Sequence, residues 1–260
     1  MKIGIDCRMF STSFTGIGRY TYELVSRLKN HEYILFFNEP EYSNYNGDFK
    51  TVLVDAKHYS LREQTSFLKA IKKENLDLMH FTHFNAPILY NRPFVVTIHD
   101  LTHSLFPGRK MTGFPYRLAY KAVVRNAVKK SKRIIAVSEN TKKDIVKMLK
   151  INPSKISVIY EGVNSEFHEM HAVEKKSVGK YLLDKYAIRK PFLLYTGVHR
   201  YHKNLPRLIE AFARISKSHK NLTLVITGKE DPLYPEAENL TRNLNLQNRI
   251  VFTGMVPEND

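Results

Sequence analysis

The segment PFLLYTGVHRYHKNLPRLIEAF, residues 191–212, contains the features that decide the fold class. Its apolar run at 192–196 lies between Pro191 and Gly197 and predicts a buried strand. From Asn204 onward the apolar residues recur at helical spacing, so we expect a helix with Asn204 as its N-cap. A strand, a glycine-containing turn and a helix in this order indicate an α/β protein. The free N–H groups at the start of such a helix can bind an anion.

The turn between that strand and that helix is basic. Arg200 and Lys203 add formal positive charge beside the helix start, and arginine can bind a phosphate through two parallel hydrogen bonds. The same residues would also fit a solvated basic loop on any α/β protein. Both interpretations stay open on the local pattern alone.

The segment resembles the start of the C-terminal domain in retaining glycosyltransferases of family 4. The resemblance rests on Gly197, on the run KNL at 203–205 and on the run LIEAF at 208–212. It implies the GT-B fold, an α/β fold in which two Rossmann-like doubly wound domains face a cleft. It also implies that Lys203 contacts the diphosphate of the donor. Many members carry arginine directly after the glycine, where this chain has Val198, so Arg200 is the nearest arginine candidate.

Apolar runs elsewhere predict strands at 2–6, 33–37, 51–54, 77–80, 94–98, 133–137 and 156–160. The first strand is followed by Gly16 and Gly18 in the run GIGRY, which opens a predicted helix. These glycines allow close approach of a ligand, although tight packing of the helix would explain them equally well. The run resembles the glycine loop of the family, which lies beside the donor phosphates or the acceptor. Thr21 stands where a full dinucleotide pattern would need a third glycine, which disfavours a nicotinamide-dependent dehydrogenase.

The strand at 94–98 delivers His99 and Asp100 to the carboxyl edge of the predicted sheet. The resemblance covers residues 95–101 and implies that His99 contacts the donor sugar near the reacting carbon. Asp100 could fix the tautomer and orientation of a histidine. These two residues are our catalytic candidates, and the alternative is a strand-end cap without chemistry.

Four further residues are candidates for the acceptor side of the cleft. His83 and Asn85 follow the strand at 77–80, and loops at the carboxyl ends of parallel strands line the ligand crevice. A lone histidine is more often structural, so that interpretation stays open. Ser138 and Glu139 open a predicted helix, with Ser138 as the N-cap, in a run that also resembles the family.

The amino-acid composition and the distribution of charge indicate which classes of partner the chain could bind. The chain has 260 residues, a net charge of +16 and a single cysteine, Cys7, which fits a reducing compartment. Residues 109–155 hold 14 Lys or Arg against Glu139 and Asp144. Such an excess suggests an anionic partner, either a membrane surface or a nucleotide sugar, unless the whole surface is simply basic. The patch has no RNP-type strand, zinc pattern or helix-turn-helix, which disfavours nucleic acid.

The predicted helix at 111–131 carries most of this charge. Its basic residues recur at spacings of three or four and form one face: Arg117, Lys121, Arg125, Lys129 and Lys132. We expect the other face to be covered by four apolar residues: Leu118, Ala122, Val123 and Ala127. A basic amphipathic helix of this kind suits an anionic leaflet, so we expect a cytoplasmic protein held peripherally on the inner face of the plasma membrane. Neither an apolar run of spanning length nor a signal-peptide pattern is present.

The resemblance divides the chain into an acceptor-side domain at 1–170, a linker at 171–190 with a short helix near 181–186, and a partial nucleotide-sugar-binding domain at 191–260. In complete family members the segments that follow hold the nucleobase and ribose contacts. We therefore expect the C-terminal part of the second domain to be missing and transfer by these 260 residues alone to be inefficient. We also expect an exposed edge strand near 250–252.

The function implied is transfer of a sugar, with retention, from a GDP-, UDP- or dTDP-sugar to a glycan or lipid-linked acceptor. The form of the family motif around Lys203 is most similar to that of mannosyl- and rhamnosyltransferases of bacterial surface polysaccharide or lipopolysaccharide synthesis. Positive groups and helix ends would stabilise the leaving diphosphate, so we expect no cofactor and, without an Asp-x-Asp pair or zinc spacing, no metal. Two alternatives stay open. One is a non-catalytic, truncated transferase-like module that binds a membrane or a partner chain. The other is a different GT-B enzyme, such as a sugar-phosphate synthase or an epimerase.

Overall fold

The computed structural model describes residues 1–11, 16–102, 114–163, 169 and 171–257. These residues form two compact units, one that ends at Gly162 and one that starts at Val163. Each unit has its own parallel sheet and its own buried core.

The first unit is built on seven parallel strands in the order β3-β2-β1-β4-β5-β6-β7. The strands are β1 (Lys2–Asp6), β2 (Glu32–Phe37), β3 (Lys50–Leu53), β4 (Leu78–Phe81), β5 (Phe94–Ile98), β6 (Arg133–Ala136) and β7 (Ile156–Val158). Each lies where an apolar run predicted it, within two residues at either end. The predicted α/β class is confirmed.

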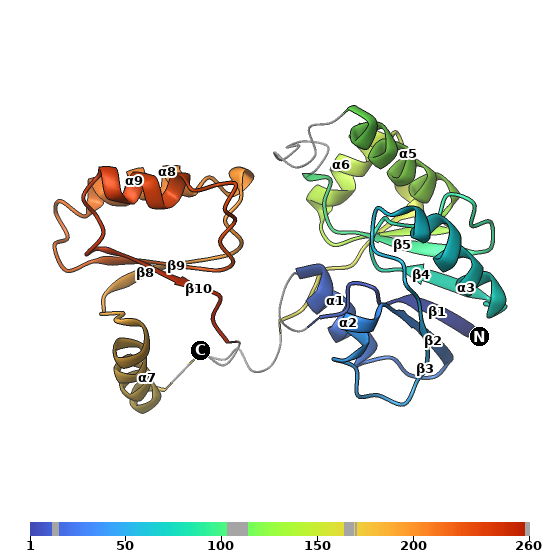
Figure 1. Ribbon diagram of the computed structural model, residues 1–260, viewed down its shortest axis with the longest axis horizontal. Helices are drawn as coiled ribbons and strands as arrows, with labels where there is room; N and C mark the ends of the chain where they lie inside the picture. Colours follow the sequence, from blue (N-terminus) through green and yellow to red (C-terminus); the bar gives the residue numbers. More distant parts are fainter. Residues whose placement is uncertain (12–15, 103–113, 164–168, 170, 258–260) are drawn as a thin grey trace. The chain divides into compact units, whose positions relative to one another are not determined.

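Helices cover both faces of this sheet (Figure 1). Helix α1 (Gly16–Val25) packs on one face, where Val25 joins a core cluster with Ile5 and Leu35. The larger cluster on the other face receives side chains from α3 (Leu68–Lys73), α5 (Phe114–Lys130) and α6 (Glu139–Leu149). The described residues of this unit also contain three shorter elements: α2 (Glu39–Tyr42), a π-helical turn at Glu63–Phe67 and a 3-10 turn at Pro153–Lys155.

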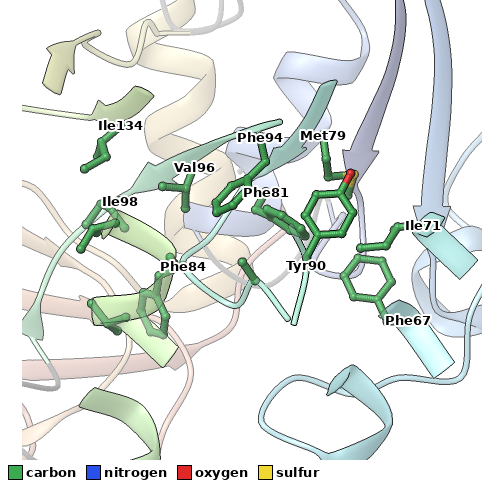
Figure 2. Close-up of a cluster of buried hydrophobic side chains, with 14 of the residues drawn as sticks. Phe67, Ile71, Met79, Phe81, Phe84, Tyr90, Phe94, Val96, Ile98 and Ile134 are labelled. Carbon is green, nitrogen blue, oxygen red and sulfur yellow. The ribbon is translucent and has the colours of Figure 1, made fainter. Parts of the chain in front are cut away.

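Strand β2 shows why the sheet is buried on both sides. Ile34 and Phe36 belong to the larger cluster, whereas Leu35 and Phe37 belong to the cluster under α1. Successive side chains of a strand point to opposite faces, so a continuous apolar run is what a doubly covered strand requires. Figure 2 shows aromatic side chains of the larger cluster, in which the rings of Phe81 and Phe94 meet edge to face at 5.3 Å.

The direction of the chain changes at β1, which lies between β2 and β4. The chain first runs outward to β3 and then returns to the opposite side of β1. In open parallel sheets, ligands bind outside the carboxyl ends of the strands at such a switch point. The loops after β1, β4 and β5 form this edge in the first unit.

The second unit has three parallel strands, β8 (Phe192–Thr196), β9 (Thr223–Thr227) and β10 (Ile250–Gly254), in the order β10-β9-β8. Helices α8 (Leu205–Ile215) and α9 (Glu236–Asn243) lie side by side on one face (Figure 1). Leu205, Ile209 and Phe212 of α8 fill the core beneath them. Helix α7 (Ala172–Tyr186) and a 3-10 turn at Tyr201–Lys203 complete the unit.

Two features of the second unit differ from expectation. Helix α7 is longer than the short helix predicted near 181–186. Strand β8 was predicted as buried, yet Leu194 is 61% exposed and Leu193 is exposed as well. The strand order accounts for this exposure, because β8 lies at an edge of the sheet. Among the described residues β8 and β10 each pair with β9 alone. The linker at 171–190 and the domain bounds 1–170 and 191–260 stay predictions.

The predicted faces of α5 are partly wrong. Its core face consists of Tyr120, Val124, Ala127 and Val128. Leu118 is 60% exposed and Ala122 is exposed too, and both share a face with Arg125 and Lys129. The helix carries more than one apolar stripe, and the stripe with tyrosine and valine buries more area than the one with Leu118 and Ala122.

Candidate functional site

A buried ion network lies under the carboxyl edge of the first sheet. Arg8 follows β1, and its Nε and Nη2 atoms donate to the two carboxylate oxygens of Asp6 at 2.9 and 2.8 Å. Nη1 donates to Glu63 Oε2 at 3.2 Å, and backbone carbonyls of Ala56 and Asn85 accept at 3.1 and 3.2 Å. All five guanidinium N–H groups therefore have partners, and the side chain is fully buried. The network ties together the loops that follow β1, β3 and β4.

The two carboxylates of this network differ in their response to burial. Burial alone would raise the pKa of Asp6, but the charge of Arg8 and its hydrogen bonds hold that pKa below its usual value. Burial raises the pKa of Glu63, and the opposing effect of Arg8 is too small to cancel it. Asp6 is therefore the main ionic partner of Arg8. Our sequence analysis did not single out Asp6, Arg8 or Glu63 and so missed this network.

His99 lies at the end of β5 with both ring nitrogens next to acceptors. Nε2 is 3.0 Å from the backbone oxygen of Thr82, and Nδ1 is 3.2 Å from Glu161 Oε1. The backbone oxygen of His99 accepts a hydrogen bond from Thr141 Oγ1 at 3.0 Å. The ring of Tyr20 meets the imidazole edge to face, with centroids 4.8 Å apart. His99 is thus fixed by groups from α1, α6 and the loops after β4 and β7.

Asp100 makes a local contact instead. Its Oδ1 accepts the backbone N–H of Thr102 at 2.9 Å, and the carboxylate beside the His99 ring is that of Glu161. Our sequence analysis assigned no role to Glu161. The catalytic roles of His99 and Asp100 stay predictions.

Below His99, a chain of hydroxyl and imidazole groups connects α1 to the sheet. Tyr20 Oη lies 3.0 Å from Thr97 Oγ1, which lies 2.9 Å from His80 Nε2. Burial lowers the pKa of His80 to about 4, so this ring is neutral near pH 7. Tyr20 belongs to the glycine run that resembles the family, and its ring brings that run against His99.

The two glycines of that run differ. A Cβ on Gly18 would lie 2.7 Å from the backbone oxygen of Met9, so Gly18 allows α1 to pack closely on the loop after β1. Gly16 is exposed, and a Cβ there would meet nothing within 4 Å. Packing is therefore a sufficient reason for glycine at 18, and phosphate binding by Gly16 and Gly18 stays a prediction.

His83 lies beside His99, and the rings of the two residues are stacked with centroids 6.3 Å apart. Nδ1 of His83 is 2.5 Å from Asn85 Oδ1. Burial lowers the pKa of His83 to about 3, although the hydrogen bond to Asn85 opposes this. In this neutral ring Nδ1 carries the proton, because the amide oxygen can only accept.

Ser138 and Glu139 begin α6 close to His99. Ser138 Oγ accepts the backbone N–H of Thr141 at 3.0 Å, which confirms it as the N-cap. Glu139 is exposed on the first turn. Thr141, held by this cap, is the residue that donates to the His99 backbone, so α6 is tied directly to the end of β5.

The basic turn of the second unit lies between β8 and α8. Arg200 Nε is 3.7 Å from Asp231 Oδ2, whereas Lys203 is exposed and has no ion pair with any described residue. Asn204 occupies the N-cap position of α8, but in a left-handed conformation and without a side-chain hydrogen bond to the helix. The turn is held close to the next strand end, since a Cβ on Gly228 would lie 2.1 Å from the backbone oxygen of Gly197.

Two kinds of feature are absent from the described residues. No group of three or more His, Cys, Asp or Glu in them could hold a metal ion. Among the same residues no helix combines the length and hydropathy that crossing a bilayer would need.

Comparison with known proteins identifies the family. A family model described as Glycosyltransferase Family 4 matches residues 14–167, and one described as Glycosyl transferases group 1 matches residues 184–260. The O-antigen chain mannosyltransferase RfbU of Salmonella typhimurium is 27% identical over 191 residues, which are 73% of this chain and 47% of that protein. The alpha-monoglucosyldiacylglycerol synthase of Streptococcus pneumoniae is 22% identical over 280 residues, covering 98% of this chain and 62% of that protein. The chain therefore spans about half to three fifths of the length of these two relatives.

Solved structures support the fold. WaaG, a glycosyltransferase involved in lipopolysaccharide biosynthesis, superposes with a TM-score of 0.68 at 18% identity, over 98% of this chain and 70% of that one. Anabaena HepE, in complex with UDP and glucose, gives a TM-score of 0.71 at 15% identity, over 99% and 70%. At such identities the likeness shows the fold alone, here α/β with Rossmann-like units. Because the first family model covers more than half of the sequence, the chain belongs to Glycosyltransferase Family 4.

Proposed function

We propose that this chain carries out glycosyl transfer, with retention, from a nucleoside diphosphate sugar to a glycan or lipid-linked acceptor in surface polysaccharide or lipopolysaccharide synthesis. The observation that carries the proposal is the arrangement around His99. Side chains from the glycine run, the loops after β4 and β7 and the start of α6 converge on this one imidazole. The family match and the printed roles of RfbU and WaaG support the same class of reaction.

The chemical task in such a transfer is to stabilise the negative charge that develops on the leaving diphosphate. Lys203 suits this task because its ammonium group is exposed and has no ion pair with a described residue. Arg200 would first have to leave Asp231, so we assign it the smaller share. Gly16 and Gly18 would approach the phosphates through backbone N–H groups of α1.

In the first unit we assign His99 and Asp100 to the glycosyl group and His83, Asn85, Ser138 and Glu139 to the acceptor. The donor nucleotide is open between UDP, GDP and dTDP, since one solved relative binds UDP and one curated relative is named a mannosyltransferase. The reaction as proposed uses no cofactor.

We also propose that α5 holds the protein on the anionic inner face of the cytoplasmic membrane. Its solvent face presents Lys121, Arg125 and Lys129 together with the exposed Leu118. A basic face with an exposed apolar side chain is the arrangement that suits a lipid surface. Lys155 does not contribute, because its Nζ donates to the carbonyls of Val128 and Lys129 at the end of the helix.

The test of donor binding is a calorimetric titration with UDP, GDP and dTDP, followed by turnover assays with the matching nucleotide sugars. We expect one nucleotide to bind, and Lys203→Ala to weaken that binding by about tenfold or more, the loss of a charged hydrogen bond. Lys217→Ala, an exposed lysine just beyond the other end of α8, is the control and should bind as the wild type does. No binding of any of the three at millimolar concentration would contradict the proposal. Binding without turnover would favour the alternative, a non-catalytic module.

A further inference from the structure

His83 offers one ring nitrogen to a ligand at the carboxyl edge of the first sheet. Its Nδ1 lies 2.5 Å from Asn85 Oδ1 and is occupied by that contact. Its Nε2 makes no hydrogen bond with a described residue, and this atom is not fully buried. The residue as a whole is only 7% exposed, and that small exposed surface includes Nε2.

The contact with Asn85 decides which nitrogen of His83 carries the proton. An amide oxygen can only accept, so the contact at Nδ1 requires a proton on that nitrogen. Burial lowers the pKa of His83 to about 3, so the ring holds a single proton near pH 7. That proton is on Nδ1, and Nε2 is left with a lone pair. Without such a partner a neutral imidazole can carry its proton on either nitrogen.

Asn85 is held in place by the buried ion network. The residue is fully buried, and its backbone oxygen accepts a hydrogen bond from Arg8 Nη2 at 3.2 Å. Its Nδ2 has no partner of ordinary hydrogen-bond geometry, but it acts on the Glu63 carboxylate, where it opposes the effect of burial on the pKa. Oδ1 is therefore the amide atom that faces His83. The network thus fixes the tautomer of His83 before any ligand binds.

A lone pair at Nε2 determines the chemistry of its partner. It attracts an O–H or N–H donor, whereas the oxygens of a diphosphate or a carboxylate can only accept and are repelled. The ring of His83 is stacked with that of His99, which we assign to the glycosyl group. A ring with a pKa of about 3 is too weak a base to remove the proton of a hydroxyl group at neutral pH. Nε2 can therefore orient a sugar hydroxyl without deprotonating it.

We propose that His83 is a specificity-determining residue that accepts, at Nε2, a hydrogen bond from a hydroxyl group of the acceptor sugar. The identity of the occupant rests on the proposed glycosyl transfer, in which this edge of the first unit binds the acceptor. A negatively charged group cannot take the place of the hydroxyl, because it has no proton to donate. The tautomer and the contact with a sugar can both be tested without turnover.

The first test is an NMR spectrum of the histidine ring nitrogens in the unliganded chain at neutral pH, with the His83 signals identified by their absence in His83→Gln. Nδ1 should have the chemical shift of a protonated nitrogen and Nε2 that of an unprotonated one. In Asn85→Leu, which removes the acceptor oxygen, both shifts should move towards the average of two exchanging tautomers. Asn44→Leu, at an exposed asparagine of the same unit, should keep the wild-type pattern. A proton on Nε2 in the wild type would overturn the inference, whether or not Asn85→Leu folds.

The second test follows the Nε2 signal of His83 while a sugar is added. The probes are the methyl glycosides of mannose, glucose and galactose, with inorganic phosphate as the anionic comparison. A hydroxyl held mainly by one hydrogen bond dissociates at about 0.1–0.4 M, so the titration runs to about 0.5 M. The signal should move and approach saturation with at least one glycoside and should not move with phosphate. His31, which is exposed at the amino edge of the same sheet, reports the non-specific effect of each solute. A signal that moves with none of the glycosides, or that moves with phosphate, would overturn the inference.

Turnover separates this inference from the proposed function. His83→Asn keeps an amide near the position of Nδ1 but has no atom at the position of Nε2. With the nucleotide sugar that binds and the glycoside that moves the signal, it should raise the KM for the glycoside by about three- to tenfold and leave the KM for the nucleotide sugar unchanged. An equal rise in both would show a merely structural role and overturn the inference. If the Nε2 signal moves but no sugar is transferred, the hydroxyl site stands and the proposed function falls. If sugar is transferred to a glycoside that leaves the signal unmoved, the function stands and the inference falls.

Discussion

Replacing Arg8 by lysine should lower the free energy of unfolding of the first unit by about 3–6 kcal/mol, because the positive charge is kept but two buried hydrogen bonds are lost. The structure gives the reason. Arg8 uses five N–H groups on Asp6, Glu63 and two backbone carbonyls, and lysine has only three. At least two buried acceptors would lose a charged donor, at about 1.5–3 kcal/mol each.

The measurement is urea denaturation followed by far-UV circular dichroism, with hydrogen exchange of β1 and β4 amides to report on the first unit alone. Arg27→Lys is the matched control, because Arg27 pairs with Glu23 on the surface of the same unit and such pairs contribute about 0–1 kcal/mol. A loss below about 1 kcal/mol in Arg8→Lys, or one equal to the control, would refute the claim that the ion network holds the edge loops together.

Three further predictions follow from the site and the surface. Lys203→Ala should reduce turnover by about two to three orders of magnitude with the fold intact, as seen by circular dichroism, and wild-type activity in this variant would show the turn to be solvated surface. The protein should lose stability as the pH falls from about 6.5 to about 4, because His80 and His83 are charged in the unfolded chain there and neutral in the folded one. By pH 4.5 each of these histidines should have lowered the free energy of unfolding by about 2–3 kcal/mol. Acid denaturation of His83→Gln should therefore depend less on pH than that of the wild type. An unchanged pH dependence would contradict the conclusion that His83 is buried in its neutral form. The fraction of protein that sediments with anionic liposomes should be lower at about 0.5 M salt than at low salt. At low salt it should also be lower for Leu118→Asp than for the wild type. Binding that does not depend on salt would exclude an electrostatic attachment.

The strands could be predicted from the sequence, whereas the ion network around Arg8 could not. Runs such as 94–98 are apolar at every position, and only a strand covered on both faces requires that. The partners of Arg8 are scattered over residues 6, 56, 63 and 85, and no local spacing connects them. Its position two residues after an aspartate, at the end of an apolar strand, was the only signal available.

Two further differences concern side chains, namely the core face of α5 and the partner of His99. Leu118 has the same hydropathy whether it faces the core or the solvent. Which face of α5 packs on the core depends on which of its apolar stripes buries more area. His99 was predicted from the strand that carries it, but its partner Glu161 comes from 62 residues further along the chain. Contacts of that range depend on the strand order of the sheet, which periodicity does not reveal.

The ion network also bears on the order of events during synthesis. A ribosome makes the chain from its amino end, and every partner of Arg8 lies within the first 85 residues. Strand β1, which Arg8 follows, pairs with β2 and β4, so it has both of its neighbours before residue 82 is added. The guanidinium group can therefore find its acceptors while residues 133–158, which supply the last two strands, are still to be made. A nascent chain of this protein need not bury an unpaired cation at any stage.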